Sequence, residues 1–172
     1  MKMAIPQNLR TTVTLAEIPD GVAGIKATLA LMVKLAQLSK SSFAVRNKAL
    51  QLVRELPQKD YFSEVGAIHE FVRDSIRYVK DIEGVETLAS PDKTLLMLQG
   101  DCDDKSLLAA ALLLSLGHQT RFVAVGNSPN NFVHVLIETK VALKWWPVET
   151  TEPVAVGWYP QGLPYRLVYN IP

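Results

Sequence analysis

The chain has 172 residues, 48% of them hydrophobic, which is enough to bury a sizeable core within one domain. Lysine and arginine number 18 against 17 aspartate and glutamate residues, so the formal net charge is +1, without a long run of either sign. This balance gives no support for a nucleic-acid or membrane-surface partner, and no apolar stretch reaches the roughly 18 uninterrupted residues of a membrane span. A single cysteine excludes an intrachain disulfide, and the chain does not open on a secretory signal pattern. We therefore expect a cytoplasmic protein in a reducing environment.

The first half of the chain predicts helices. Residues 9–18 alternate as a strand does, within an N-terminal arm over residues 1–20. The spacing of apolar residues then predicts helices over 22–38 and 43–56. No chain break, repeat or linker divides the sequence, so we expect one domain over residues 1–172, with its core over residues 60–151.

A third helix is predicted to begin at Asp60, which is a good N-cap residue. The apolar residues that share one face of this helix are Val65, Ile68, Val72 and Ile76. His69 has no chemical partner near it in sequence, so we expect it on the solvated face. A short extended piece over 76–79 and a short helix opened by Ser90 and Pro91 follow.

The centre of the sequence is an apolar helix that opens on the only cysteine. The run SLLAAALLLSLG from Ser106 is rich in helix formers and ends at Gly117, and either Asp101 or Gly100 can cap its start. Cys102 then lies in the first turn, where the helix dipole favours a thiolate. Two readings stay open, because Asp103 and Asp104 in the same turn disfavour a second anion and because free cysteines are often simply buried.

Short β-branched and aromatic segments follow the central helix and predict antiparallel strands over 121–125, 132–138, 143–148 and 166–169, with a loop over 126–131. His134 lies in the middle of the second of these strands. Strict alternation predicts Phe132, His134, Leu136 and Glu138 on one face. His118 lies beyond the far end of the central helix, roughly 20 Å from Cys102, and is excluded as its partner.

The strand over 143–148 supplies a candidate acid. If the hairpin turns at Val141 and Ala142, Glu149 lies directly opposite His134, close enough to accept its ring N–H. The turn lacks the Gly, Asn or Asp that usually fixes the register of a hairpin. A cysteine nucleophile needs a base to take its proton and a third group to orient that base, so Cys102, His134 and Glu149 form a candidate triad.

Several segments resemble one family. GDCDDK (100–105), RFVAV (121–125), FVHVLIE (132–138) and WPVET (146–150) are similar to the transglutaminase-like superfamily of cysteine enzymes, as are FVRDSIRYVKD (71–81), VETL (85–88) and SPDKTL (90–95) upstream. The resemblance covers residues 60–151 and is strongest to bacterial and phage-associated members. It implies an α+β fold with a papain/transglutaminase-like core, in which a cysteine-bearing central helix packs against a small antiparallel sheet that carries the histidine and the acid.

Carried over residue by residue, the resemblance implies Cys102 as nucleophile, His134 as general base and acid, and Glu149 as the third member, where the family most often has Asp. It implies acyl transfer on amide bonds through a thioester, with a protein or peptide substrate and with hydrolysis favoured over transamidation. The alternative is a non-catalytic binding or assembly module of a phage-related particle.

An acyl-transfer site also needs donors for the oxyanion. The backbone N–H of Cys102 is the first candidate, followed by the side chains of Gln99, Trp145 and Trp146. We expect no metal and no cofactor, because the sequence has neither a zinc or calcium pattern nor a phosphate-binding glycine loop. The sequence does not indicate an oligomeric state.

Overall fold

The computed structural model describes residues 19–80 and 87–172, so the strand predicted within residues 9–18 lies outside the described residues. The helices are α1 (Gly21–Ser39), α2 (Phe43–Val53), α3 (Tyr61–Ser75), α4 (Pro91–Met97) and α5 (Cys102–Ser115). The strands are β1 (Arg77–Tyr78), β2 (Gln99–Gly100), β3 (Thr120–Ser128), β4 (Asn131–Val141), β5 (Lys144–Val148) and β6 (Tyr165–Asn170).

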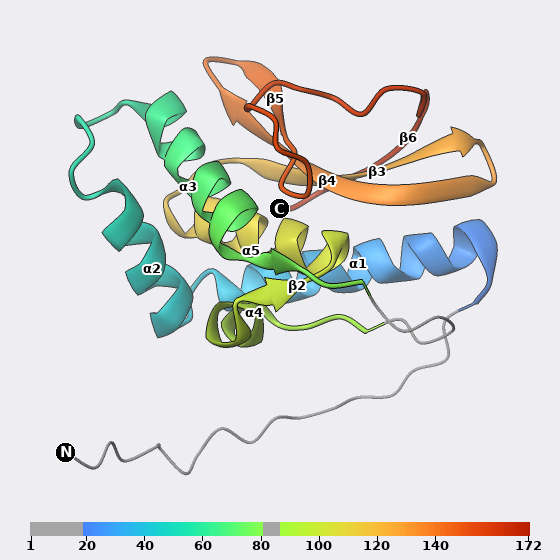
Figure 1. The fold of residues 1–172 in the computed structure, drawn as a ribbon, viewed down its shortest axis with the longest axis horizontal. Coiled ribbons are helices and arrows are strands. Elements are labelled where there is room, and N and C mark those ends of the chain that lie inside the picture. The colour runs from blue at the N-terminus through green and yellow to red at the C-terminus, as the bar shows by residue number, and fades with distance from the viewer. Residues whose placement is uncertain (1–18, 81–86) are drawn as a thin grey trace, which may run out of the picture.

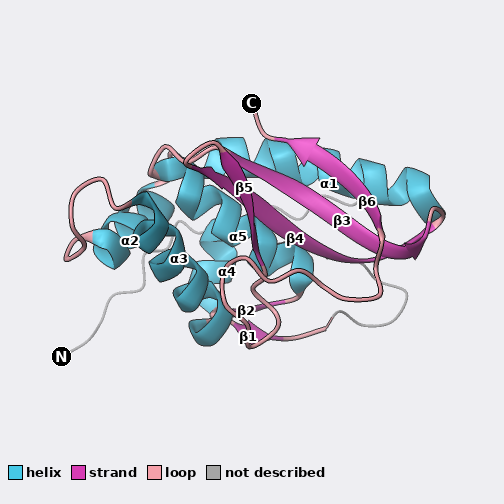
Figure 2. Cartoon of the chain, turned by 90° about the horizontal axis from the view of Figure 1, so that it is seen from above, coloured by secondary structure: helices cyan, strands magenta, loops and turns pink. Residues whose placement is uncertain are grey.

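The elements form two layers, with the helices gathered on one face of an antiparallel sheet (Figure 1). The strand order in this sheet is β5-β4-β3-β6, and Figure 2 shows the strands lying across the helical layer. The short parallel pair of β1 and β2 lies at one end of the helical layer, just before α5 begins. The predicted arrangement of helices first and antiparallel strands second is therefore observed.

Helix α5 is the centre of the fold. It contacts all four other helices and also β3 and β4, and its residues from Asp104 to Leu113 are all buried. A helix that is apolar all round is stable only when neighbours cover every face, which is the situation of α5. Gly117 ends this region with a φ of +92°, the left-handed conformation that favours glycine.

The caps that were predicted from local sequence are present. The side chain of Asp60 accepts a hydrogen bond from the Ser63 N–H at 3.2 Å, and that of Ser90 accepts one from the Lys93 N–H at 3.3 Å. Pro91 occupies the first turn of α4, as expected. The predicted helix over 43–56 is three residues too long, because α2 ends at Val53.

The hairpin between β4 and β5 differs from its prediction. Its turn consists of Ala142 and Leu143, whose φ angles of 49° and 68° are left-handed, so β5 begins at Lys144 and not at residue 143. Both central residues of a two-residue type I′ turn have positive φ, a conformation for which Gly, Asn and Asp are the usual residues. Alanine and leucine are not among them, so these residue types carry no signal for a turn at this place. The register is consequently shifted by two residues, with Ile137 opposite Val148.

The connection between β3 and β4 is tighter than the predicted loop over 126–131. The two strands pair as far as Ser128 and Asn131, and the register shifts on either side of Gly126. A side chain at Gly126 would bring a Cβ to 2.1 Å from the Asn131 carbonyl oxygen. This close approach of two backbones requires glycine.

The sheet has apolar residues on both faces. The inner face packs against the helices through Phe122, Ala124, Val135, Ile137 and Val148. The outer face carries a smaller cluster of Val123, Val125 and Leu136, which is covered by Tyr159 and Leu163 from the segment before β6. Among the described residues, one helix, α1, is long and apolar enough to cross a membrane, and it contacts α5, β3, β4 and β6.

Candidate active site

Cys102 is the first residue of α5. Its neighbour Asp101 caps the helix, with Oδ1 accepting hydrogen bonds from the backbone N–H groups of Asp103 at 2.9 Å and Asp104 at 3.1 Å. Of the two cap residues that the sequence allowed, the structure therefore selects Asp101. These bonds satisfy the second and third N–H groups of the helix.

The start of α5 docks on β4 at the point where β5 ends. The last pair of the β4–β5 ladder joins Ile137 to Val148. Val135, which precedes Ile137 by two residues in β4, therefore has no partner in β5. The N–H of Val135 donates to the sulfur of Cys102, and its carbonyl accepts from the Ser106 hydroxyl at 3.0 Å. The helix thus takes the place of the missing strand residues and holds the thiol against β4.

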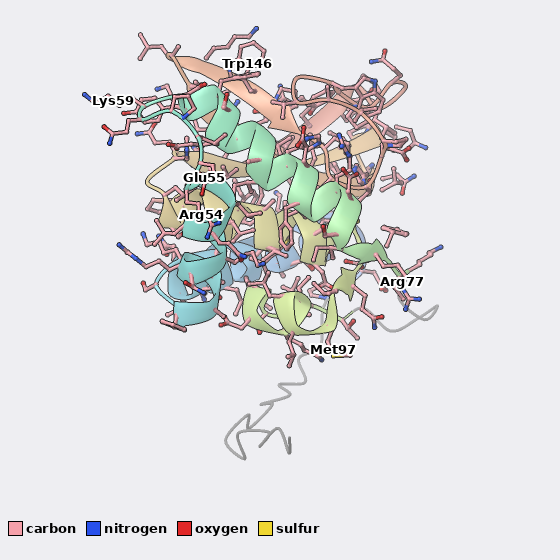
Figure 3. The ribbon with its side chains drawn as sticks, turned by 60° about the vertical axis from the view of Figure 1, so that its left-hand side comes forward. Arg54, Glu55, Lys59, Arg77, Met97 and Trp146 are labelled. Carbon is pink, nitrogen blue, oxygen red and sulfur yellow. The ribbon has the colours of Figure 1, made fainter. Side chains whose placement is uncertain are left out.

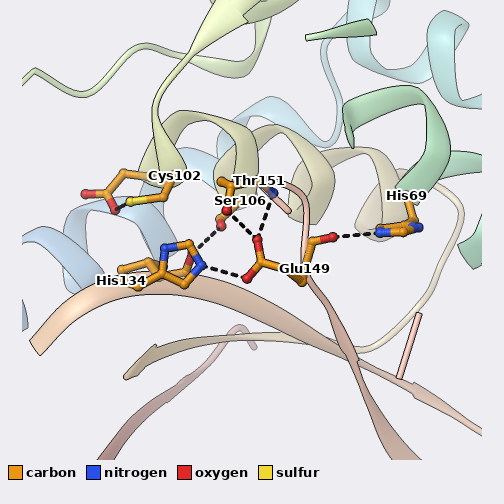
Figure 4. A network of polar contacts seen from close by, with 8 residues as sticks. His69, Cys102, Ser106, His134, Glu149 and Thr151 are labelled. Carbon is orange, nitrogen blue, oxygen red and sulfur yellow. Dashed lines mark hydrogen bonds and ion pairs between the residues drawn. The ribbon is translucent and has the colours of Figure 1, made fainter. Parts of the chain in front are cut away.

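His134 is the residue before Val135, and in the view of Figure 4 its ring lies between Cys102 and Glu149. A bulge lies just before His134, because Val125 pairs with His134 whereas the adjacent Gly126 pairs with Phe132. The predicted strict alternation is wrong here: Phe132 packs against the inner core, whereas Leu136 packs on the outer face. The bulge absorbs one residue between them, and the His134 side chain is left 18% exposed.

Glu149 lies just beyond the end of β5, and its side chain is fully buried. Its Oε2 lies 2.6 Å from Nε2 of His134, and its Oε1 accepts from the backbone N–H and the hydroxyl of Thr151 at 2.7 and 2.6 Å. The contact expected between His134 and Glu149 is therefore observed. The predicted register was wrong by two residues, but a shift of two keeps a side chain on the same face.

The carboxylate of Glu149 is ionised. Burial raises its pKa, but the hydrogen bonds from His134 and Thr151 and the charge of His134 outweigh burial and hold the pKa below its usual range. A carboxylate only accepts hydrogen bonds, so Nε2 of His134 carries the proton that it donates. In the neutral ring, Nδ1 is then the basic nitrogen, and it has no hydrogen-bond partner among residues 19–80 and 87–172.

The thiol of Cys102 is held in its neutral form. Burial raises its pKa, as do the charges of Asp103 and Asp101, and the N–H of Val135 opposes them only in part. The Sγ–H also donates to Asp103 Oδ1 at 3.5 Å. Burial and the two aspartates thus favour a thiol over a preformed thiolate in the resting site.

Replacement of Asp103 tests this electrostatic control. We expect Asp103→Asn to lower the pKa of the Cys102 thiol and to raise the rate of its alkylation by iodoacetamide at pH 8 by about three- to tenfold. Glu55→Gln is the matched control, because it removes one negative charge from a side chain that is 83% exposed, two residues after the end of α2. Equal alkylation rates in the Asn variant and the wild type would show that Asp103 has no influence on the thiol.

His69 lies in the core and not on the surface. It was expected on a solvated face of α3, but it is 2% exposed, and its Nε2 lies 2.6 Å from the carbonyl oxygen of Glu149. Burial lowers its pKa, and this outweighs the hydrogen bond to Glu149 that raises it. The signal was present in the spacing, because Val65, Ile68, His69 and Val72 fall on one stripe of the helix.

Two other polar residues near the core have structural partners. Lys105 is buried, and its Nζ donates to the carbonyls of Arg73 at 3.2 Å and Ile76 at 2.8 Å, so it closes the C-terminal end of α3. His118 binds Glu64 through Nε2 at 2.7 Å, beyond the opposite end of α5 from Cys102. Its exclusion from the site agrees with this position.

Comparison with known families identifies the fold. The family model described as the transglutaminase-like superfamily matches residues 50–150, which is more than half of the chain. The chain belongs to the transglutaminase-like superfamily. The resemblance stated from the sequence is thereby confirmed, and so is the predicted α+β fold with a transglutaminase-like core.

Solved structures share this transglutaminase-like fold at low sequence identity. A proposed cysteine protease from Cytophaga hutchinsonii is 18% identical, with a TM-score of 0.52 over 73% of this chain and 45% of its own. A proposed protease from Parabacteroides distasonis is 14% identical, with a TM-score of 0.60 over 84% of this chain and 29% of its own. A structure of the Rad4/XPC nucleotide excision repair complex is 14% identical, with a TM-score of 0.53 over 85% of this chain and 46% of its own.

The chain thus spans less than half the length of each of these three proteins. No curated protein sequence matches it. Superfamily membership supports a cysteine-dependent enzyme in general, and the reaction has to be argued from the site itself.

The candidate hydrogen-bond donors to the oxyanion differ in their position relative to Cys102. The backbone N–H of Cys102 has no acceptor among the described residues, so it is available at the thiol. Gln99 points to β1, where its Oε1 accepts from Arg77 at 2.8 Å, and Figure 3 shows Arg77 far from Trp146. Trp146 packs edge-on against Phe62 of α3.

Trp145 lies on the outer face of the sheet. Its ring packs under the guanidinium of Arg121 at 4.1 Å, and Arg121 pairs there with the buried Glu138. Both tryptophans precede Glu149 in β5 by at least three residues, or about 10 Å of strand. The structure therefore brings neither of them to Cys102, whereas the backbone N–H is in place.

The donor set also bears on metal binding. Within residues 19–80 and 87–172, no group of three or more histidine, cysteine, aspartate or glutamate side chains is arranged to hold a metal ion. The carboxylate of Glu149 contacts His134 and Thr151.

Proposed function

We propose that this chain is a cysteine-dependent acyl-transfer enzyme that acts on amide bonds of a protein or peptide, with water as the acceptor. The observation that carries the proposal is the bond between His134 Nε2 and Glu149 Oε2 at the place where Cys102 docks on β4. This bond fixes the tautomer in which Nδ1 is the base on the side of the thiol.

The chemistry follows from the neutral thiol. As the sulfur of Cys102 attacks the amide carbonyl carbon, its proton passes to Nδ1 of His134, and Glu149 stabilises the imidazolium that forms. The oxyanion of the tetrahedral intermediate accepts a hydrogen bond from the backbone N–H of Cys102. His134 then returns the proton to the leaving nitrogen, the C–N bond breaks, and a thioester on Cys102 remains.

Water completes the cycle. Nδ1 of His134 takes a proton from water, whose oxygen attacks the thioester carbonyl, and the C–S bond breaks as the thiol regains a proton from the ring. A primary amine in place of water would give transamidation by the same steps. The exposed fraction of His134 supports water as acceptor, because solvent reaches the ring.

A second candidate is a binding or assembly module with an inactive site. The observation in its favour is the neutral thiol, since burial and Asp103 raise the pKa of Cys102, away from that of a reactive thiolate. The two proposals differ in whether an acyl group ever becomes attached to the sulfur.

A trapping experiment separates the two. The purified chain is incubated with a library of peptides and quenched in acid, and the peptide that contains Cys102 is analysed by mass spectrometry. We expect a thioester adduct on Cys102 of the wild type and none on Cys102→Ala. The released product should be a carboxylic acid, and an added primary amine should divert part of the thioester to an amide product instead.

A binding module gives a different result. Peptides would then be retained equally by the wild type and by Cys102→Ala, with no adduct on the sulfur and no cleavage. That outcome would overturn the enzymatic proposal.

A further inference from the structure

His69 joins α3 to the acid of the candidate triad. Its ring is buried, and Nε2 lies 2.6 Å from the backbone carbonyl oxygen of Glu149, 80 residues further along the chain. We infer that His69 is a positioning residue, which fixes the backbone of Glu149 so that its carboxylate meets His134. The inference rests on the proposed function, because it gives His69 a role in the same reaction.

The backbone of Glu149 needs such a partner. The β4–β5 ladder ends at Val148, so no strand partner is present for the Glu149 carbonyl, although the residue is fully buried. A buried carbonyl without a hydrogen bond is strongly unfavourable, and an unanchored strand end moves easily. His69 supplies the bond from the neighbouring helix (Figure 4).

The carboxylate and the backbone are thus held from different sides. Thr151 and His134 donate hydrogen bonds to the two carboxylate oxygens of Glu149, and His69 donates one to its backbone carbonyl. Without the third contact, Glu149 can rotate about its own backbone while it keeps its bond to Thr151, which is only two residues away. The distance to His134 would then no longer be fixed.

A neutral imidazole suits this position. A carbonyl only accepts, so Nε2 of His69 carries the proton, and burial favours the uncharged ring. A lysine or arginine here would add its charge to that of Lys105, which already interacts with Glu149, and would compete with His134 for the carboxylate. Arg73, Asp74 and Glu70 of the same helix act on His69 with opposite signs.

The test uses the acylation of Cys102 by p-nitrophenyl acetate, followed from pH 5 to 9. We expect His69→Leu, which removes the donor, to lower the acylation rate about tenfold. We expect His69→Gln, whose amide keeps an N–H donor, to stay within about threefold of the wild type. The ring N–H signal of His134 in the NMR spectrum should weaken by faster solvent exchange in the Leu variant and return in the Gln variant.

Two results would overturn the inference. One is a Leu variant with the acylation profile and the His134 signal of the wild type. The other is a wild-type spectrum, labelled with ¹⁵N, in which Nε2 of His69 lacks its proton; this measurement also decides the matter if the Leu variant does not fold.

Failure of the proposed function looks different. If His134→Ala acylates as fast as the wild type, the triad is not catalytic, whatever His69 does. If His134→Ala is slow and His69→Leu is not, only the positioning role of His69 is wrong.

Discussion

Replacement of His134 by alanine should slow the acylation of Cys102 by a factor of about 10² to 10⁴, the usual contribution of a general base. The effect is large because burial and Asp103 raise the pKa of the thiol, so the sulfur depends on an acceptor for its proton at the moment of attack. The measurement is the rate of p-nitrophenol release from p-nitrophenyl acetate, with the adduct located on Cys102 by mass spectrometry.

His118→Gln is the matched control for this prediction. It removes another histidine that is paired with a glutamate, His118, which is buried beyond the other end of α5. We expect it to lower stability, because Glu64 loses its partner, and to leave the acylation rate per folded molecule unchanged. An alanine variant at 134 that reacts as fast as this control would remove the basis for the candidate triad.

Replacement of Glu149 by glutamine should also lower the acylation rate by about 10² to 10⁴, through the tautomer of His134. The glutamine amide can donate to Nε2, which stabilises the ring with its proton on Nδ1 and leaves no base on the side of the thiol. Glu149→Asp keeps the charge on a shorter arm, and we expect a smaller loss. An amide variant as active as the aspartate variant would contradict the orienting role of the charge.

The same residue makes stability depend on pH. Because the pKa of Glu149 is lowered in the folded state, its ionised form stabilises the fold above its ordinary pKa of about 4.3, and this contribution is lost as the pH falls through the folded pKa. Urea unfolding of the wild type below pH 4.5 should therefore show a decline in the free energy of unfolding that is flatter in Glu149→Gln.

The parts of the fold that depend on near neighbours were predicted well. Asp60, Ser90 and Gly117 act at the ends of helices through contacts within a few residues, and a local pattern is sufficient to predict such contacts. The apolar composition of α5 predicted its central position for the same reason, since such a helix has to be covered on all sides.

The parts of the fold that depend on contacts between distant residues were predicted less well. The left-handed turn at Ala142 and Leu143 carries no residue type that signals it, so the register was wrong by two residues. The predicted pair of His134 and Glu149 survived only because an even shift keeps the face. The bulge just before His134 lies at the close approach of the two backbones at Gly126, which is a property of two strands together.

His69 shows the limit most clearly. Its position on the apolar stripe of α3 could have been predicted from the spacing of the apolar residues. Its hydrogen-bond partner could not, because that partner lies 80 residues away in the chain. A polar residue on a buried stripe indicates that a partner exists without naming it. The side chains of Asp103 and Thr151 act on the site through equally specific geometry.

The docking of α5 on β4 has a consequence for solubility. A sheet edge with open N–H and carbonyl groups is a template for the strands of other molecules, and β4 would be such an edge wherever β5 does not cover it. Here the N–H and the carbonyl of Val135 form hydrogen bonds with Cys102 and Ser106. In the neighbouring edge strand, β5, Pro147 cannot donate a backbone hydrogen bond. The residues that present the nucleophile therefore also protect this stretch of β4 from pairing with the strands of other molecules.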